Sequence, residues 1–556
     1  MASDCQIETD VLVVGGGLAG VLAAIKACED GASVILADKG YVGKSGGAAF
    51  GAVDLGVFNP EWGHDKKTYM DFIVKVGEYI NNRDWIEIVL KESYARYQDM
   101  ASWGVAHMVE EPKDATGEWM LHFKVPRGSS YAVQLIDQSH PDPLGSWRQY
   151  MVVLRKQAEK AGVKIMDRIM LVDLLKQDGR VVGAAGFHAV DGDFYVIKAK
   201  ATIVATGTGH FKAPGQPMSY WTADGEAMSY RAGAEITGKE FGSKDNGRVN
   251  NEPTRRKIPF WLNRTTNALG EEVPTKYSPG FYAFDRRSLS LYFEVHEGRA
   301  PLFIDKTENP EDGKLEWIVG HGTGWVRATA GVVINTKCES GLPGLYAAGI
   351  CAGTHFMGSC YAPTGYGLMV PAVTGYRAGE NATSFAKSSG KLEVNEKEIS
   401  RLKAAIMGPL QRNSGFTAGW VTQMVQNLML PYYISQVKHG ERLQAALTLL
   451  KFIEGHLCPQ IQARDAHELR MAHEVRNIAQ NAEMMLTSSL FRAESRGGHF
   501  REDYPHRVDP DWLAWTVLKN DGGEMTPYKV PVPEKWWPDL SLPYEQRYEF
   551  KLLGEA

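Results

Sequence analysis

The sequence of 556 residues predicts an α/β fold: a Rossmann-like domain, interrupted by an inserted α+β domain, then a helical bundle and an extended tail. Three observations predict it. A complete strand–turn–helix–strand unit occupies residues 10–39, further apolar strands occur at 199–209 and 344–349, and helical periodicity dominates from residue 395. The length leaves room for three or four domains with an ample core.

The N-terminal unit is the most informative part of the chain. An apolar strand, Val11–Val14, runs into Gly15, Gly17 and Gly20 in G-x-G-x-x-G spacing, and a helix-forming stretch and a second apolar strand follow. The glycines permit a tight turn and a close approach to a pyrophosphate, while the helix N-terminus offers unpaired N–H groups. Asp38 lies where a carboxylate can accept a ribose 2′-hydroxyl. This context predicts a bound dinucleotide, either NAD or FAD.

Several later segments narrow the choice. Residues 199–209 form a buried strand ending in Ala-Thr-Gly, and residues 344–349 form a third strand in Gly/Ala-rich surroundings. A T-A-D-G sequence at 222–225 opens a helix, and ESRGGHFREDYP occupies 494–505. In this order, the segments resemble the flavoprotein subunits of succinate dehydrogenase and fumarate reductase, whose relatives include L-aspartate oxidase and the alpha subunit of adenylylsulfate reductase. The resemblance covers nearly the whole chain and implies an FAD-dependent oxidoreductase.

Periodicity and composition divide the chain. Residues 1–228 and 330–385 are expected to form one discontinuous FAD-binding domain. Residues 229–329, rich in aromatic and basic side chains, are expected to form a capping domain that closes on the flavin. Residues 390–508 carry apolar side chains at helical spacing and should form the helical domain. Residues 509–556, rich in Trp, Pro and Tyr, form the tail, which covers either this chain or a second subunit.

The resemblance implies a set of flavin contacts. The expected FAD-binding residues are Gly15, Gly17, Leu18, Ala19, Gly20, Asp38, Lys39, Lys44, Ser45, Gly46, Gly47, Ala205, Thr206, Gly207, Asp224 and Gly349. Gly46 stands where succinate dehydrogenase-like chains carry a histidine joined covalently to FAD, so the flavin should be noncovalent. Ile350 stands where the family has an acidic residue near the ribityl chain, so that contact is absent or comes from elsewhere.

The substrate side departs further from relatives that act on dicarboxylates. Glu240 and Phe241 are present, but the residues that follow, 242–247, lack the family's histidine, and the other dicarboxylate ligands are also not kept. A C4-dicarboxylate is therefore not the expected substrate. The polar candidates facing the cap are Lys244, Asp245, Arg286, Arg287, His321, Arg327, His355, Tyr361 and Tyr366.

Four of these candidates are the predicted catalytic residues: His355, Arg327, Arg286 and Tyr361. Arginine could bind an anionic substrate through two parallel hydrogen bonds. Histidine or tyrosine could act as a general acid or base. Each also has an ordinary structural explanation, as a solvated charge or as a packing residue whose polar atoms are satisfied.

Composition argues against several other classes. The formal net charge of −5 comes from charges spread along the chain, which predicts no nucleic-acid partner. No stretch approaches 18 uninterrupted apolar residues and no signal segment precedes the first strand, so a cytoplasmic protein without a transmembrane segment is expected. The six cysteines are scattered and form no C-x-x-C pair, which predicts reduced thiols and no metal or iron–sulfur site.

Two functional hypotheses follow. The first is a flavoprotein subunit, adenylylsulfate reductase-like, that moves two electrons to or from a small polar or anionic substrate by hydride or N5-adduct chemistry. A separate iron–sulfur electron-transfer subunit would then supply the electrons, and oligomer formation stays open. The second is a non-catalytic electron-transfer flavoprotein subunit whose substrate site has decayed. The missing dicarboxylate ligands favour the second hypothesis, whereas the basic and aromatic cap favours the first.

Overall fold

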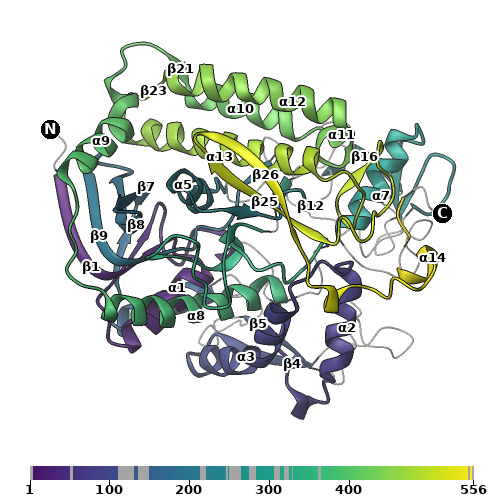
Figure 1. The fold of residues 1–556 in the computed structure, drawn as a ribbon, viewed down its shortest axis with the longest axis horizontal. Coiled ribbons are helices and arrows are strands. Elements are labelled where there is room, and N and C mark those ends of the chain that lie inside the picture. Colours follow the sequence, from purple (N-terminus) through teal and green to yellow (C-terminus); the bar gives the residue numbers. More distant parts are fainter. Residues whose placement is uncertain are drawn as a thin grey trace.

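A computed structural model of the chain shows a central sheet with helices on both faces, and C-terminal helices along the top of Figure 1. The structure describes residues 4–49, 54–110, 131–135, 149–212, 221–245, 248–249, 265–273, 284–305, 314–318, 325–328, 330–360, 365–548 and 551–553.

The central sheet has the strand order β6–β2–β1–β9–β8–β7, and β19 pairs with β9 beside this path. Its strands are β1 (Asp4–Val14), β2 (Val34–Asp38), β6 (Lys164–Asp167), β7 (Ile169–Gln177), β8 (Arg180–His188), β9 (Phe194–Val204) and β19 (Leu345–Ala347). The pairs formed by β6, β2, β1, β9 and β19 are parallel, whereas β7 and β8 pair antiparallel. The carboxyl ends of the parallel strands therefore meet at one edge, where ligands bind in such sheets.

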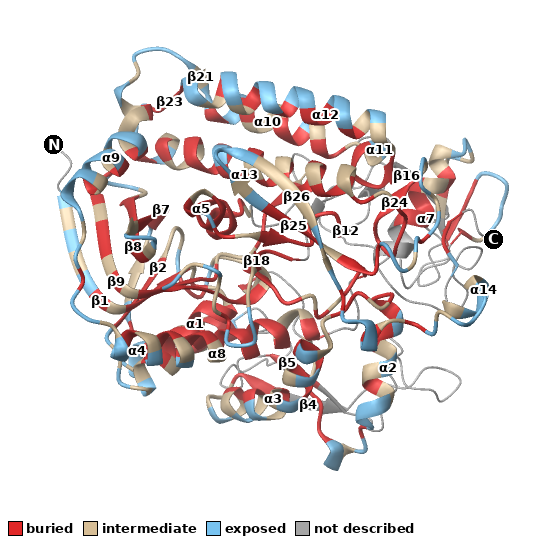
Figure 2. Ribbon diagram, viewed as in Figure 1, coloured by how far each residue is buried: buried red, intermediate tan, exposed pale blue. Residues whose placement is uncertain are grey.

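The two faces of this sheet bury different cores, because side chains alternate along a strand. Val11 and Val13 of β1 pack with α1 and α8, whereas Leu12 and Val14 lie in a second core with residues of α5 and α13. The covering helices are α1 (Leu18–Glu29), α8 (Tyr366–Ser388), α5 (Asp224–Ala232) and α13 (Ala466–Phe491). Figure 2 shows that α1, α5 and the strands beside them are largely buried. The predicted Rossmann-like arrangement is confirmed.

A smaller layer extends this domain. A three-stranded sheet and three helices form it: β3 (Asp54–Leu55), β4 (Ala106–Glu110), β5 (Tyr131–Leu135), α2 (Lys66–Val76), α3 (Arg83–Ser102) and α4 (Tyr150–Lys160). The connector from Gly77 to Asn82 joins α2 to α3. It reaches the segment after β19, because the Gly77 carbonyl accepts a hydrogen bond from the amide of Ser359 at 3.1 Å.

The inserted segment contributes two sheets and a helix. The first sheet joins β10 (His210–Lys212), β17 (Trp325–Ala328) and β12 (Gly242–Asp245). The second joins β13 (Arg248–Val249), β16 (Lys314–Ile318), β15 (Leu302–Asp305) and β14 (Thr265–Thr266), and α7 (Phe284–His296) belongs to the same region. The exact bounds of this domain stay a prediction.

The helical region follows the predicted periodicity. Its helices are α9 (Glu396–Met407), α10 (Ala418–Met429), α11 (Tyr432–Ser435), α12 (Gly440–Phe452) and α13. Buried apolar residues of α10, α12 and α13 form one shared core, in which Val421, Leu450 and Ile478 are fully or almost fully buried. Two short parallel pairs tie the region together: β21 (Phe416–Thr417) with β23 (Ile461–Gln462), and β22 (Val437–Lys438) with β24 (Phe500–Arg501).

The tail, predicted to be extended, contains a β-hairpin that packs on its own chain. The strands β25 (Ala514–Asp521) and β26 (Glu524–Pro531) pair antiparallel around Gly522 and Gly523, both of which have positive φ. An Asp-Gly-Gly sequence between two strands is a recognised hairpin signal. The hairpin joins β11 (Ile236–Thr237), β18 (Val332–Val333) and β20 (Ala352–Gly353) in a five-stranded sheet, and α14 (Tyr544–Arg547) follows it.

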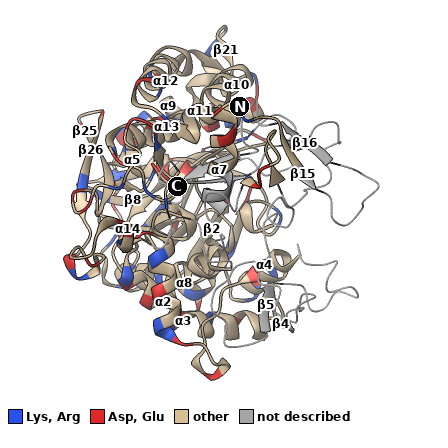
Figure 3. Cartoon of the chain, turned by 90° about the vertical axis from the view of Figure 1, so that its right-hand side faces the viewer, with Lys and Arg blue, Asp and Glu red and all other residues tan. Residues whose placement is uncertain are grey.

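Positions of Lys and Arg and positions of Asp and Glu are interspersed along the chain in Figure 3. Among the described helices, none combines the length and the apolar character that a membrane crossing requires.

Candidate active site

The glycine turn lies between β1 and α1, at the carboxyl edge of the parallel strands. Gly15 has a φ of 104°, and a Cβ there would lie 2.7 Å from the carbonyl oxygen of Ala205. Gly17 is the N-cap residue of α1 and makes no side-chain cap, and a Cβ there would meet no atom within 4 Å. The first N–H groups of α1 therefore lie beside open space, which fits the pyrophosphate of a dinucleotide. Leu18 and Ala19 of this first turn are themselves buried.

Asp38 links the glycine turn to the loop after β2. One carboxylate oxygen, Oδ2, accepts a hydrogen bond from the Gly16 amide at 2.7 Å. The other, Oδ1, accepts from the Gly40 amide at 2.7 Å and lies 2.9 Å from the Ser45 hydroxyl. Each carboxylate oxygen can accept two hydrogen bonds, so Oδ2 retains the capacity to bind a ribose hydroxyl. The ribose contact stays a prediction.

The loop that carries Gly46 is open on one side and closed on the other. A Cβ on Gly46 would meet no atom within 4 Å, whereas one on Gly47 would lie 2.2 Å from Cζ2 of Trp221. Lys44 is exposed, with its Nζ 5.8 Å from the ring centroid of Tyr41. The loop therefore leaves room beside the residue that stands in place of the family's histidine.

Lys39 and Asp224, both predicted to bind the cofactor, bind each other. The Lys39 ammonium lies 2.9 Å from a carboxylate oxygen of Asp224 and 2.9 Å from one of Glu474. Asp224 also accepts hydrogen bonds from Thr222 at 2.7 Å and Asn477 at 2.8 Å. Burial disfavours the charge on Lys39, but the two carboxylates outweigh it and raise the pKa of Lys39. These contacts join β2, α5 and α13, so both side chains have a structural partner.

The ends of β9 and β19 complete the edge of the sheet. The Thr206 hydroxyl accepts a hydrogen bond from the Gly225 amide at 2.8 Å, which holds the strand end against α5. Gly207 faces open space, since a Cβ there would meet no atom within 4 Å. The Gly349 amide donates to the Thr374 hydroxyl at 2.9 Å, which ties the end of β19 to α8. The structure thus brings the predicted strand ends together.

A buried ion pair behind this edge was missed by the sequence analysis. Lys239 and Glu226 have fully buried side chains and bind each other. Lys239 also donates to Asn481 at 3.2 Å, and Thr208 donates to Glu226 at 3.2 Å. Burial raises the pKa of Glu226, while the Lys239 ammonium opposes that rise. Lys239 stands between Gly238 and Glu240 in the sequence, so no local pattern signalled its burial.

His355, a predicted catalytic residue, is held from two sides. Its ring stacks on Trp515 of β25, with centroids 5.0 Å apart and an interplanar angle of 15°. Its Nε2 lies 2.9 Å from the hydroxyl oxygen of Thr237 in β11. Burial, reinforced by the Arg492 cation, lowers the pKa of His355 to about 3. The imidazole is therefore neutral at physiological pH.

The other catalytic candidates are placed less fully. Arg327 lies in β17, with its Cα paired to those of His210 and Ser243, and Arg286 lies near the start of α7. Several candidates lie outside the described part of the chain, either as whole residues or by their side chains: Lys244, Asp245, Arg286, Arg287, His321, Arg327 and Tyr361. Tyr366 is buried at the start of α8 and its ring stacks on Phe356, 5.1 Å away.

The ESRG segment has a structural role. Arg496 and Glu494 form a buried ion pair, with Nε 2.7 Å from Oε1 and both side chains fully buried. Arg496 also binds Asp509 of the tail at 2.7 Å. Arg492 binds Glu494 at 2.7 Å and Glu240 at 2.8 Å. This network joins the cap, the helical region and the tail beside His355.

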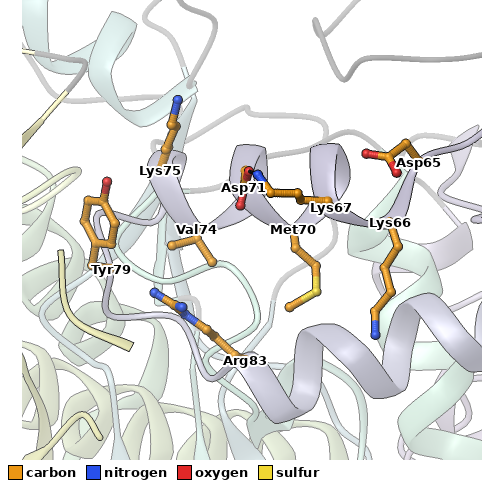
Figure 4. A pocket seen from close by; sticks show the side chains of 9 residues that line it. All are labelled: Asp65, Lys66, Lys67, Met70, Asp71, Val74, Lys75, Tyr79 and Arg83. Atoms are coloured by element: carbon orange, nitrogen blue, oxygen red, sulfur yellow. Dashed lines mark hydrogen bonds and ion pairs between the residues drawn. The ribbon is translucent and has the colours of Figure 1, made fainter. Parts of the chain in front are cut away.

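A separate cleft of about 690 Å³ lies between α2 and α3 (Figure 4). Its lining residues are Asp65, Lys66, Lys67, Met70, Asp71, Val74, Lys75, Tyr79 and Arg83. Lys67 binds Asp71 at 2.6 Å, and Lys66 lies 3.3 Å from Glu87. Arg83 donates to the carbonyl of Trp536. Because these cations have partners within the chain, we assign no ligand to the cleft.

Comparisons with known proteins indicate an FAD-binding chain. Residues 10–242 match the FAD binding domain family, and residues 423–545 match the fumarate reductase flavoprotein C-terminal family. The chain therefore combines an FAD-binding domain with the C-terminal domain of fumarate reductase flavoproteins, and its relatives include flavoprotein subunits of fumarate reductase and succinate dehydrogenase. This flavoprotein is therefore an FAD-dependent oxidoreductase.

Two relatives span nearly the whole flavoprotein. An uncharacterized FAD-dependent oxidoreductase of Methanocaldococcus jannaschii is 27% identical, over 92% of this chain and 96% of the relative. A CoM/CoB fumarate reductase chain of Methanothermobacter marburgensis is 26% identical, over 92% and 97%. The adenylylsulfate reductase of Archaeoglobus fulgidus shares the fold, with a TM-score of 0.75 and 20% identity over 96% of this chain and 97% of the other.

Proposed function

We propose that this flavoprotein transfers two electrons to or from a small polar or anionic substrate that is not a C4-dicarboxylate. The observation that carries the proposal is the sequence after Glu240 and Phe241. It reads Gly-Ser-Lys-Asp, where relatives that act on dicarboxylates have a histidine. The loop at Gly46 resembles that of the adenylylsulfate reductase alpha subunit, which supports a reaction of that type.

The residues at the sheet edge would hold FAD without a covalent bond. The open N-terminus of α1 would bind the pyrophosphate, and Oδ2 of Asp38 would accept a ribose hydroxyl. The loop from Ser45 to Gly47 and the strand end at Thr206 and Gly207 would line the remainder. Bound FAD would supply the two-electron chemistry, while the protein orients the substrate and handles charge and protons.

The substrate side would combine residues from the cap and the FAD-binding domain. Arg327 on β17 and Arg286 on α7 come from the inserted segment and would bind negative charge on the substrate. His355 and Tyr361 follow β20 and would make hydrogen bonds to the reacting end of the substrate.

The electrons would come from a separate iron–sulfur subunit, and the protein would work in the cytoplasm. The six cysteines are all free, and no C-x-x-C pair occurs in the sequence. The relative from Methanothermobacter marburgensis is itself named as one subunit of its enzyme. A cluster-bearing partner would complete the electron path, which this chain has no sequence motif to provide.

Anaerobic stopped-flow spectroscopy tests the proposal. The dithionite-reduced holoprotein is mixed with adenylylsulfate, fumarate or other enoates, and the oxidised holoprotein with sulfite and AMP, while flavin absorbance is followed. A fast change with one non-dicarboxylate compound, lost in Arg327→Gln, supports the proposal. Fast reoxidation by fumarate refutes the substrate class, and a response only to artificial dyes favours the electron-carrier alternative.

A further inference from the structure

We propose that the C-terminal hairpin positions His355 as the Nε2–H tautomer, so that Nδ1 accepts a hydrogen bond from an O–H or N–H group of the substrate. This inference deepens the proposed function and rests on it for the identity of the site. It makes Trp515 and Thr237 positioning residues.

The tautomer follows from the hydrogen bonds of Thr237. Its hydroxyl oxygen lies 2.8 Å from the backbone carbonyl of Thr516 and 2.9 Å from Nε2 of His355. A carbonyl can only accept, so the single hydroxyl proton of Thr237 points to Thr516. The hydroxyl oxygen must then accept from Nε2–H. A neutral imidazole has one N–H group, so Nδ1 is left as an acceptor.

The surroundings keep the ring neutral. Among the side chains that the structure describes, the charged one that acts on His355 is Arg492, whose cation adds to the effect of burial in lowering the pKa of the imidazole. Arg492 itself binds the Glu240 carboxylate at 2.8 Å. The groups of β11, β25 and the α2–α3 connector that contact His355 are the side chains of Thr237 and Trp515 and the amide of Asn82, all uncharged.

Trp515 fixes the plane of the imidazole. The two rings stack, and the indole N–H of Trp515 donates to the carbonyl of Ile80 at 2.7 Å, so the indole is itself anchored. The amide of Asn82 donates to the carbonyl of His355 at 3.0 Å. His355 has a φ of 48°, a conformation that a non-glycine residue keeps only when its contacts hold it there.

Gly238 leaves the acceptor side of the ring uncovered. Its φ is 69°, and a Cβ at this position would lie 3.1 Å from Cε1 and 3.6 Å from Nδ1 of His355. Among the described residues, none donates a hydrogen bond to Nδ1. Gly238 thus avoids a clash with the Cβ of Ala330, which would lie 2.5 Å away, and leaves this edge of the ring uncrowded.

This arrangement selects a class of substrate. A group with an O–H or N–H can donate to Nδ1, whereas an ionised carboxylate presents only acceptors and would face an acceptor without a proton between them. Leaving a desolvated acceptor unpaired costs binding energy. The same geometry therefore disfavours fumarate and succinate at this position and favours a substrate that carries a proton there.

A spectroscopic experiment tests the tautomer without any substrate. Holoprotein labelled with ¹⁵N-histidine is studied by long-range ¹H–¹⁵N correlation NMR, and His355 is assigned by its loss in His355→Asn. We expect one neutral Nε2–H pattern between about pH 5 and 8. An Nδ1–H pattern, or protonation of His355 in this range, overturns the inference even if the enzyme reaction is found.

Matched variants test the positioning residues. Thr237→Val should give a mixture of the two His355 tautomers and lower kcat/KM by roughly ten- to a hundredfold. Thr237→Ser, which keeps the hydroxyl, should keep the single Nε2–H tautomer and the original kcat/KM. Trp515→Leu should lower kcat/KM, and Trp515→Phe, which keeps the stacked ring, should recover most of it. Trp537→Phe is the control, since Trp537 lies in the same tail and bonds the Val532 carbonyl at 2.8 Å.

The outcomes separate the two proposals. Unchanged NMR patterns in Thr237→Val and Trp515→Leu overturn the positioning role. If no compound reoxidises the flavin but the Nε2–H pattern changes with Thr237→Val, the tautomer stands and the proposed function fails. If fumarate is the fast acceptor of an enzyme with the Nε2–H tautomer, the inferred substrate class is wrong.

Discussion

Replacing Lys239 by methionine should destabilise this flavoprotein strongly. Lys239 and Glu226 are both fully buried and bind each other, and Glu226 also accepts a hydrogen bond from Thr208 at 3.2 Å. Methionine fills similar space but leaves the Glu226 carboxylate without a cation. Removing one partner of such a pair costs about 3–5 kcal/mol of unfolding free energy.

The effect should depend on pH in a definite direction. Burial raises the pKa of Glu226 above its unfolded value, and the loss of Lys239 removes the charge that opposed this rise. A buried acid whose pKa is raised in the folded protein costs least stability below about pH 4, where it is protonated in both the folded and the unfolded state. The stability deficit of Lys239→Met should therefore grow as the pH rises from there towards neutrality.

Urea unfolding followed by tryptophan fluorescence, at a series of pH values, measures this deficit. The double variant Glu226→Gln/Lys239→Met should recover most of the lost stability, because no buried charge remains. Lys519→Met is the control, since Lys519 and Asp521 are about half exposed, and its effect should stay within about 1 kcal/mol. A Lys239→Met deficit no larger than the control's, or one that shrinks as the pH rises, refutes the reasoning.

Three further variants test other parts of the fold. Gly15→Ala should purify with little bound flavin, because Gly15 has a φ of 104° and the new Cβ would press on Ala205. Gly31→Ala is the control and should keep its flavin, because Gly31 has a φ of 85° but open space around it. The ratio of flavin to protein absorbance measures the difference. Asp224 has a pKa held below its usual value by Lys39 against the effect of burial, so its contribution to stability is present at neutral pH and lost as the pH falls below about 4. Between neutral and acid pH, the melting temperature should fall less steeply in Asp224→Asn than in the unchanged protein. An equally steep fall contradicts this pairing. Arg496→Met should cost about 3–5 kcal/mol in chemical unfolding, and an effect no larger than that of exposed Arg401→Met would argue against a buried network.

Local pattern was enough for the nucleotide-binding unit and the helices. The turn at Gly15 depends on residues within a few positions, and the helices of the C-terminal region follow from apolar side chains spaced three or four apart. The hairpin at Asp521–Gly523 also had a local signal, but the abundance of Trp and Pro around it favoured an extended tail. Periodicity describes each element by itself and carries no information on which faces meet.

The sequence by itself indicated a dinucleotide from the local unit at residues 10–39, and it indicated FAD and the departure from dicarboxylate ligands from the resemblance of several short motifs. Each motif is readable because it is a run of neighbouring residues. Only the tertiary structure decided how the site is held. Lys39 meets Asp224, Lys239 meets Glu226, and His355 lies between Thr237 and Trp515, which come from separate strands. Ion pairs of this kind, and the choice of the histidine nitrogen that carries the proton, depend on contacts between segments far apart in the sequence. Those contacts exist only once the chain has folded.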